Sequence, residues 1–451
     1  MERAIVFELN EVPPRVLDWW SKTTPSSPLA KLASSGTRST TILDENLPRD
    51  LYPSQSWASV GMGAPWDDHQ VFWYGDPKSQ DHPFYWQQAA TSGRSVGLVG
   101  VLHSSPVSTQ CPGDQFRFVI PDVFSGNAET IPAALQPLQE LNLRMTRQSA
   151  RVASLSASPK DVLAAVDFAR NGVRPATWAR LGRLAAEVAT GRSNKERLRV
   201  GQALLMADVF VHQVRRHDTD LSVMFGNHVA SAMHRYWAAT FPADWADNPY
   251  TSEWISANKA ELPFAMEATD LIVGQLQRLA DDTDRELIVL SSMGQKADLS
   301  VDPTQQEQAI IKDADALLAR LDCPFSLTIR PAMVPQLSFE LDDPTEVDEF
   351  VAWLRSALGD AAHDPMVSGP VVTIACNPTT VDGKVVINGE RFIAEAIGGT
   401  IQKIHDHRSG RHSTDGILLS NRRRDWPEVV DALDATGLIL QNGESSNQLA
   451  A

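Results

Sequence analysis

Cysteine is scarce in this sequence of 451 residues. The three cysteines, Cys111, Cys323 and Cys376, are odd in number and lie far apart. They supply neither a disulfide framework nor a CxxC metal site, and their scarcity favours a reducing compartment. The first apolar run, Ile5-Val6-Phe7, is too short for a signal peptide or a membrane span. We therefore expect a cytoplasmic protein without a membrane span.

Basic residues are outnumbered by acidic ones. The chain has 40 Lys and Arg against 56 Asp and Glu, which gives a net charge of −16. A charge of this sign repels polyanions, so general nucleic-acid binding is not expected. The hydrophobic fraction of 43% is that of an ordinary globular protein. At roughly 100–200 residues per domain, the length allows two to four domains or one large α/β core with insertions.

Several common sequence signatures are absent. There is no GxxxxGK[ST] loop, and Gly61-Met62-Gly63 does not extend to GxGxxG. The segment Trp57-Ala58-Ser59-Val60-Gly61 lacks the first glycine of a nucleophile elbow. These absences disfavour a P-loop nucleotide-binding protein and an ordinary serine hydrolase.

Short apolar runs predict the buried strands of a parallel sheet. They occupy residues 5–9, 94–102, 220–225 and 286–290. Three of the runs lead into polar residues, namely Asn10, Asn227 and Ser292. Ligands in open α/β sheets collect at the carboxyl ends of the strands. We therefore expect these three side chains to lie around a common site.

Helical periodicity dominates the middle of the chain and recurs between the predicted strands. Helices are predicted at residues 16–33, 160–170, 177–190, 196–214, 261–280 and 347–358, and a hairpin is predicted around Asp382-Gly383. The expected fold is a three-layer α/β sandwich with a mostly parallel sheet. Residues 1–120 and 217–451 would form this core, and residues 121–216 would form a helical cap.

Five segments, in this order, resemble those of the alkaline phosphatase superfamily, especially its type I phosphodiesterase/nucleotide pyrophosphatase branch. They are IVFELNE at 5–11, PSQS at 53–56 with HQV at 69–71, LSVMFGN at 221–227 with His234, IVLSSMG at 288–294, and GRHSTDGIL at 410–418. The resemblance spans nearly the whole chain. It implies an alkaline phosphatase-like fold and hydrolysis or transfer of a phosphoester.

The resemblance also assigns roles to individual residues. It places Ser56 at the position of the nucleophile, and it places Asn227, His234 and His412 at positions that bind metal. Asn10, Asn227 and Ser292 stand where the family has aspartates, and Met293 stands where it has a histidine. The list of catalytic candidates is therefore Ser56, His234 and His412.

The ordinary two-metal centre of the family is not expected here. Two divalent cations about 4 Å apart repel each other, and neutral amides and hydroxyls do not offset that repulsion as carboxylates do. One divalent ion, most simply zinc, would be held by His234, His412 and the Asn227 carbonyl, because three protein ligands plus water are typical of catalytic zinc. Glu8 or Glu11 would add a carboxylate if the register of the first strand is shifted.

Two alternatives to this one-metal centre stay open. In a metal-free centre, His234 or His412 would act as general base, and Arg408 or Arg411 would stabilise the anion. In a catalytically inactive member of the superfamily, the same pocket would bind an anionic ligand, or the chain would act as a scaffold.

The expected substrate is a small anionic or sugar-like molecule with a phosphodiester-type or pyrophosphate-type bond. Trp57, beside Ser56, and Trp237, near His234, are expected at the pocket wall, where an aromatic face would stack on a flat or sugar-like group. The remaining ligand-binding candidates are Asn10, Ser292, Arg408 and Arg411.

Overall fold

The fold is that of a computed structural model, which describes residues 2–47, 50–78, 80–147, 168–300, 307–311, 313–330, 332, 336–358, 365–375, 380–381, 384–387, 390–392, 401–405 and 408–441. The chain divides into two compact units. Unit 1 comprises Met1–Phe72, Lys78–Ser300 and Arg408–Ala451, and unit 2 comprises Trp73–Pro77 and Val301–His407. The predicted boundaries of a cap at residues 121 and 216 stay a prediction, since the division into units falls elsewhere.

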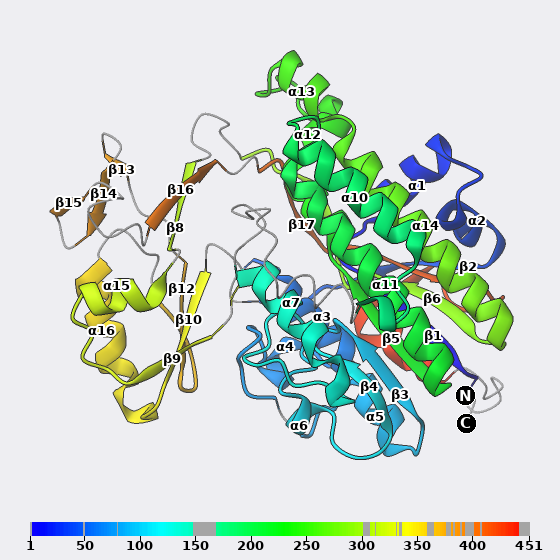
Figure 1. Cartoon of the computed structure of the whole chain (residues 1–451), viewed down its shortest axis with the longest axis horizontal. Coiled ribbons are helices and arrows are strands. Elements are labelled where there is room, and N and C mark those ends of the chain that lie inside the picture. The colour runs from blue at the N-terminus through cyan, green and yellow to red at the C-terminus, as the bar shows by residue number, and fades with distance from the viewer. Residues whose placement is uncertain are drawn as a thin grey trace. The chain divides into compact units, whose positions relative to one another are not determined.

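Unit 1 contains an eight-stranded sheet with the strand order β19-β2-β18-β6-β1-β5-β3-β4 (Figure 1). The strands are β1 (Ala4–Leu9), β2 (Thr37–Ile42), β3 (Val96–Val99), β4 (Phe116–Ile120), β5 (Leu221–Gly226), β6 (Glu286–Leu290), β18 (Asp415–Ser420) and β19 (Val429–Asp431). Strand β1 lies between β5 and β6 and runs parallel to both. Of these eight strands, β18 runs antiparallel to its neighbours β6 and β2, and the sheet is otherwise parallel.

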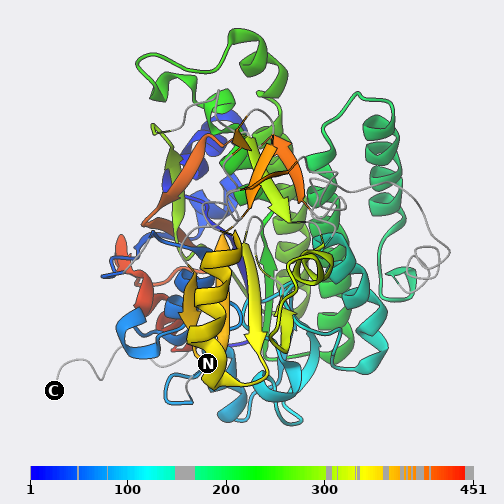
Figure 2. The ribbon, with the colours of Figure 1, turned by 90° about the vertical axis from the view of Figure 1, so that its left-hand side faces the viewer.

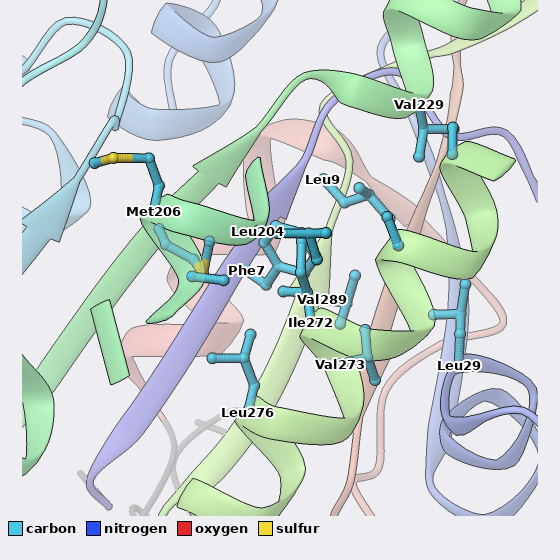
Figure 3. Packing of buried hydrophobic residues seen from close by; sticks show 14 of the residues in the cluster. Phe7, Leu9, Leu29, Leu204, Met206, Val229, Ile272, Val273, Leu276 and Val289 are labelled. Carbon is cyan, nitrogen blue, oxygen red and sulfur yellow. The ribbon is translucent and has the colours of Figure 1, made fainter. Parts of the chain in front are cut away.

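Helices cover both faces of this sheet because its central strands are apolar on both sides. On one face, Phe7 of β1 and Val289 of β6 pack against Leu204 and Ile272 in a single buried cluster (Figure 3). These two partners belong to α11 (Leu198–His217) and α14 (Glu261–Thr283). On the opposite face, α5 (Tyr85–Thr91) contacts β1 through Glu8. The predicted α/β fold with a mostly parallel sheet between helices is confirmed.

The other α-helices described in unit 1 lie between these strands in the chain, except α17, which follows β19. They are α1 (Pro14–Thr23), α2 (Pro28–Ser35), α3 (Pro53–Met62), α4 (Trp66–His69), α6 (Val107–Gln110), α7 (Gln136–Arg147), α10 (Pro175–Ala189), α12 (His228–Thr240), α13 (Ser252–Asn258) and α17 (Ala435–Leu440). Figure 1 shows α11, α12 and α14 together along one side of the sheet. Across the described ranges, no helix has both the length and the apolar character needed to cross a membrane.

The predicted helix at residues 16–33 is two helices, α1 and α2. Pro25 lacks a backbone N–H, and its ring disfavours the helical conformation of the preceding residue, Thr24. The first helix therefore ends at Thr23. Ser27 then starts the second helix, because its hydroxyl accepts a hydrogen bond from the Ala30 N–H at 3.2 Å. Of the predicted helix at 160–170, residues 160–167 lie outside the described residues.

Unit 2 contains a four-stranded antiparallel sheet with the order β11-β12-β10-β9. Its elements are β8 (Glu307–Ile311), α15 (Ala314–Arg320), β9 (Leu327–Arg330), β10 (Gln336–Leu341), α16 (Val347–Leu358), β11 (Met366–Ser368), β12 (Val371–Ala375), β13 (Thr380–Val381), β14 (Lys384–Ile387), β15 (Glu390–Phe392) and β16 (Ile401–His405). Helix α16, yellow in Figure 2, packs Phe350 and Leu354 against Phe339 of the sheet.

Two sequence predictions in unit 2 agree with the structure. Helix α16 has the predicted bounds, 347–358. Strands β13 and β14 pair antiparallel on either side of residues 382 and 383, as a hairpin requires, although these two residues lie outside the described ranges.

Candidate metal centre

The carboxyl ends of β1 and β5 bring two polar side chains together in unit 1. The register pairs Leu9 with Gly226, so the next residues, Asn10 and Asn227, are neighbours across the sheet edge. The Asn10 Nδ2 donates to the Asn227 Oδ1 at 2.8 Å. This is the arrangement that the parallel-strand argument predicts for these two residues.

Glu11 follows directly and turns the chain away from the sheet. Its backbone has a φ of 60°, a left-handed conformation that is uncommon for residues other than glycine and that recurs at functional sites. Its carboxylate is buried, with a residue exposure of 1%. Oε1 accepts a hydrogen bond from Asn10 Nδ2 at 2.8 Å, and Oε2 accepts one from Gln295 Nε2. Both carboxylate oxygens are therefore held by amides.

His234, on α12, faces this carboxylate with its ring fixed in one tautomer. Its Nδ1 lies 3.1 Å from the Gly410 carbonyl oxygen, which accepts hydrogen bonds but donates none, so Nδ1 carries the proton. The other nitrogen, Nε2, lies 2.9 Å from Glu11 Oε2. In the neutral ring this nitrogen has a lone pair. A second proton or a cation is therefore required between Nε2 and the carboxylate.

His412 approaches the same oxygen from β17 (Gly410–Ser413), which pairs with β7 (Gly294–Ala297). Its Nε2 is buried, has no hydrogen-bond partner, and lies 3.5 Å from Glu11 Oε2. The rings of His234 and His412 are 4.9 Å apart and nearly perpendicular. Ligand atoms of Glu11, His234 and His412 lie within 4.8 Å of one another. We call these three residues the triad.

The charges of the triad suit a divalent cation. Burial raises the pKa of Glu11, but the imidazoles of His234 and His412 outweigh it and lower that pKa to about 2. Burial lowers the pKa of His412 to about 4, although Glu11 opposes the shift. At neutral pH, Glu11 is thus ionised and His412 is neutral. These are the protonation states in which carboxylates and imidazoles bind metals.

The donor set of the triad fits zinc. Two imidazole nitrogens and one carboxylate oxygen are a ligand set of catalytic zinc sites, with the fourth position left to water or substrate. The unpartnered Nε2 of His412 supports this fit, because a buried polar atom without a partner costs roughly 1–3 kcal/mol. The Gly410 carbonyl that orients His234 is the outer contact that metal-binding histidines usually make.

From the sequence, the Asn227 carbonyl was the expected third metal ligand, and Glu11 was only an alternative. In the structure the Asn227 Oδ1 accepts a hydrogen bond from Asn10 Nδ2 at 2.8 Å, and its role as a metal ligand stays a prediction. The signal for Glu11 was its place immediately after a buried strand. Glu11, the candidate carboxylate ligand, directly follows Asn10 in the chain.

Ser56 lies in the first turn of α3 and is fully buried. Its Oγ is 2.9 Å from the Ser292 Oγ and 3.4 Å from the Pro53 carbonyl oxygen. The structure therefore pairs the predicted nucleophile with a predicted ligand-binding residue. The nucleophilic role of Ser56 stays a prediction.

The two tryptophans predicted at a pocket wall are both buried. The Trp57 Nε1 donates to Asn10 Oδ1 at 2.7 Å, so both the nitrogen and the oxygen of the Asn10 amide have partners within the protein. The Trp237 Nε1 donates to Asp244 Oδ2 at 2.8 Å, and its ring packs against Phe241. Their predicted contacts with a ligand stay predictions.

The predicted anion-binding arginines, Arg408 and Arg411, are both exposed. Arg411 directly precedes His412 on β17. The Arg408 carbonyl oxygen accepts a hydrogen bond from the Tyr250 hydroxyl at 2.8 Å, which fixes the backbone before that strand. Both side chains are accessible to an anionic molecule from solvent.

Comparisons with known proteins give matches among solved structures only. No protein-family model and no curated protein matches the chain. Phosphonoacetate hydrolase from Sinorhizobium meliloti 1021, in complex with phosphonoacetate, aligns over 98% of this chain and 95% of its own, with 11% identity and a TM-score of 0.45. Murine ectonucleotide pyrophosphatase/phosphodiesterase 5 aligns over 97% and 94%, with 11% identity and a TM-score of 0.40. At these values the matches assign no activity to the chain.

Proposed function

We propose that this protein hydrolyses or transfers a phosphoester, of phosphodiester or pyrophosphate type, at a centre with one divalent metal ion. The observation that carries the proposal is that the Nε2 atoms of His234 and His412 both approach one carboxylate oxygen, Glu11 Oε2. The ordered segments that resemble the phosphodiesterase branch supply the phosphoester part of the proposal. The triad supplies the metal part.

The triad would hold the ion, and zinc is the ion that its ligands favour. A bound divalent ion acts as a Lewis acid, which lowers the pKa of water and draws charge from a phosphoryl oxygen. Glu11 contributes the negative charge, and Asn10 and Gln295 fix both of its oxygens. The Gly410 carbonyl keeps the Nε2 of His234 free for the ion.

One ion rather than two is proposed because the polar side chains next to Glu11 are uncharged and already hydrogen bond to one another. Asn10 hydrogen bonds to Trp57, Asn227 and Glu11, and Ser56 is paired with Ser292. None of these five side chains, Asn10, Trp57, Asn227, Ser56 and Ser292, carries a charge that would offset a second cation.

An anionic substrate has donors available at the same edge of the sheet. Asn227 is exposed and directly precedes α12, whose N-terminal peptide groups favour negative charge. Arg411 is exposed beside His412. Ser56 is proposed as the nucleophile on the resemblance. Water is the alternative nucleophile, because Ser56 is fully buried beside Ser292.

Metal analysis and an assay with p-nitrophenyl phosphate mono- and diesters test the proposal together. We expect wild-type protein to bind one zinc ion per chain and to hydrolyse at least one ester class. His412→Ala should lose both properties, whereas His82→Ala, a histidine outside the triad, should keep both. Ser56→Ala should keep the metal and lose turnover if the serine is the nucleophile.

Two results would contradict the proposal in different ways. Absence of bound metal in the wild type, even with zinc added, would reject the metal centre. Stoichiometric zinc without hydrolysis of any ester would favour the alternative of an inactive protein that binds an anionic ligand.

A further inference from the structure

Gln295 contacts the triad but was not among the site residues predicted from the sequence. It lies on β7, and its side chain is buried, with a residue exposure of 2%. Its Nε2 donates to Glu11 Oε2 and also to the Ala230 carbonyl oxygen at 3.1 Å. Both hydrogens of one amide nitrogen are therefore used, one on the carboxylate and one on a helix backbone.

The position of Gln295 connects it with all three elements that carry the triad. In the β7–β17 ladder, Gln295 is the direct cross-strand partner of His412. Ala230 lies four residues before His234 on α12, one turn away, and helical side chains lean toward the preceding turn. One side chain thus touches Glu11, lies opposite His412 and is anchored on the turn beneath His234.

The orientation of the Gln295 amide follows from its partners. The Glu11 carboxylate and the Ala230 carbonyl both accept hydrogen bonds, so the nitrogen has to face them. Gly410 leaves room for the amide oxygen, because a Cβ at that position would lie 2.8 Å from Gln295 Oε1 and 2.6 Å from the Met233 carbonyl oxygen. The same glycine supplies the carbonyl that orients His234.

We propose that Gln295 is a positioning residue of the metal centre, which holds Glu11 Oε2 at the place where both histidine Nε2 atoms can share an ion with it. This inference rests on the proposed function. Without the Gln295 amide, Glu11 Oε1 would keep the Asn10 hydrogen bond, but Oε2 would be left with the two imidazoles alone, at 2.9 Å and 3.5 Å, and no amide would fix its position. Outer contacts of this kind typically change metal affinity by roughly 10–100-fold.

Gln295→Met tests the inference, because methionine has a similar volume and makes no comparable hydrogen bond. We expect zinc affinity, measured by competition with a chelator, to fall about 10–100-fold. The visible absorption of the Co²⁺-loaded protein should shift, because the ligand geometry changes. At saturating metal, kcat for a p-nitrophenyl ester should fall while KM changes little. Gln213→Met is the matched control, since Gln213 is also 2% exposed and donates one hydrogen bond, to Asn171.

A second variant separates positioning from general loss of structure. Gln295→Asn keeps an amide but is one methylene shorter, so it should also lose zinc affinity while its thermal unfolding stays close to that of the control. Zinc affinity and Co²⁺ absorption equal to wild type in both Gln295 variants would overturn the inference and leave the metal centre standing. A wild-type protein that binds no metal would reject the proposed function, and the inference with it.

Discussion

Two buried carboxyl groups at the end of β1 have opposite electrostatic properties, although they are three residues apart. Glu8 is 2% exposed and accepts one hydrogen bond, from the Tyr85 hydroxyl at 3.0 Å. Burial raises its pKa to about 8, although the Tyr85 hydrogen bond lowers it. Glu11 is 1% exposed, and there the opposing effect of two imidazoles prevails over burial, so its pKa falls to about 2.

The difference shows that the partners of a buried carboxyl decide its charge, because desolvation acts on both groups alike. Glu8 faces the α5 side of the sheet and is neutral at pH 7. Glu11 lies beyond the strand end, among imidazoles and amides, and is ionised. Of these two, Glu11 alone offers a charged ligand to a cation, and four predictions test the contrast.

Glu11→Gln should nearly abolish zinc binding, whereas Glu8→Gln should leave it within about twofold of wild type. Structural zinc sites with four ligands bind with about 10–16 kcal/mol, so one ligand contributes on the order of 4 kcal/mol, or roughly 10³-fold in affinity. The measurement is competition with a chelator at pH 7. Equal losses in the two variants would show that the contrast between the carboxyls does not govern metal binding.

Glu8 should destabilise the folded protein as the pH rises. In the unfolded chain this carboxyl ionises near its ordinary pKa of 4.5, but in the folded chain the pKa is about 8. The stability that Glu8 contributes at low pH is therefore lost as the pH rises toward 8, by about 3 kcal/mol between pH 5 and pH 8. Urea unfolding of wild type and Glu8→Gln at both pH values measures it. A pH-independent difference between the two would contradict a raised pKa.

Glu11 should have the reverse dependence in metal-free protein. Its folded pKa of about 2 lies below the ordinary value of 4.5, so its contribution to stability is present above pH 4.5 and is lost as the pH falls toward 2. Between pH 6 and pH 3 the loss should be about 2 kcal/mol. Chelator-treated wild type and Glu11→Gln, unfolded in urea at the two pH values, would reveal it. The contrast fails if both proteins lose the same stability on acidification.

Tyr85→Phe should have the smallest effect. It removes the one hydrogen bond that favours ionised Glu8, at a cost of about 1 kcal/mol, and it raises the pKa of Glu8 further. The cost should therefore be greater at pH 8.5 than at pH 5. Tyr250→Phe is the control, because Tyr250 donates to the neutral Arg408 carbonyl oxygen and its loss should cost the same at both pH values.

The central strands and several helices could be predicted from local pattern alone. Residues 286–290 form β6 with the predicted bounds, because a continuous apolar run fits a strand buried on both faces. Helix α16 also has the predicted bounds. The division of residues 16–33 into two helices was missed, although Pro25 and the capping Ser27 are local signals.

The candidate site was predicted only in part. The meeting of Asn10 and Asn227 follows from parallel neighbouring strands, which bring their carboxyl ends to one edge. Glu11 was predicted only as an alternative ligand. Its place in the triad depends on a left-handed turn and on His234 and His412, which lie 223 and 401 residues further along the chain. Gln295 had no signal, since a single polar residue on a short strand is common.

The sequence by itself determined that three apolar strands lead into neutral polar residues, Asn10, Asn227 and Ser292. It also contains the three residues of the triad, Glu11, His234 and His412. The tertiary structure decided which glutamate is charged and how His234 presents its ring, because the deciding carbonyl of Gly410 lies 176 residues away in the chain. Charge and tautomer depend on atoms a few ångströms away in space, and neighbours along the sequence do not supply them.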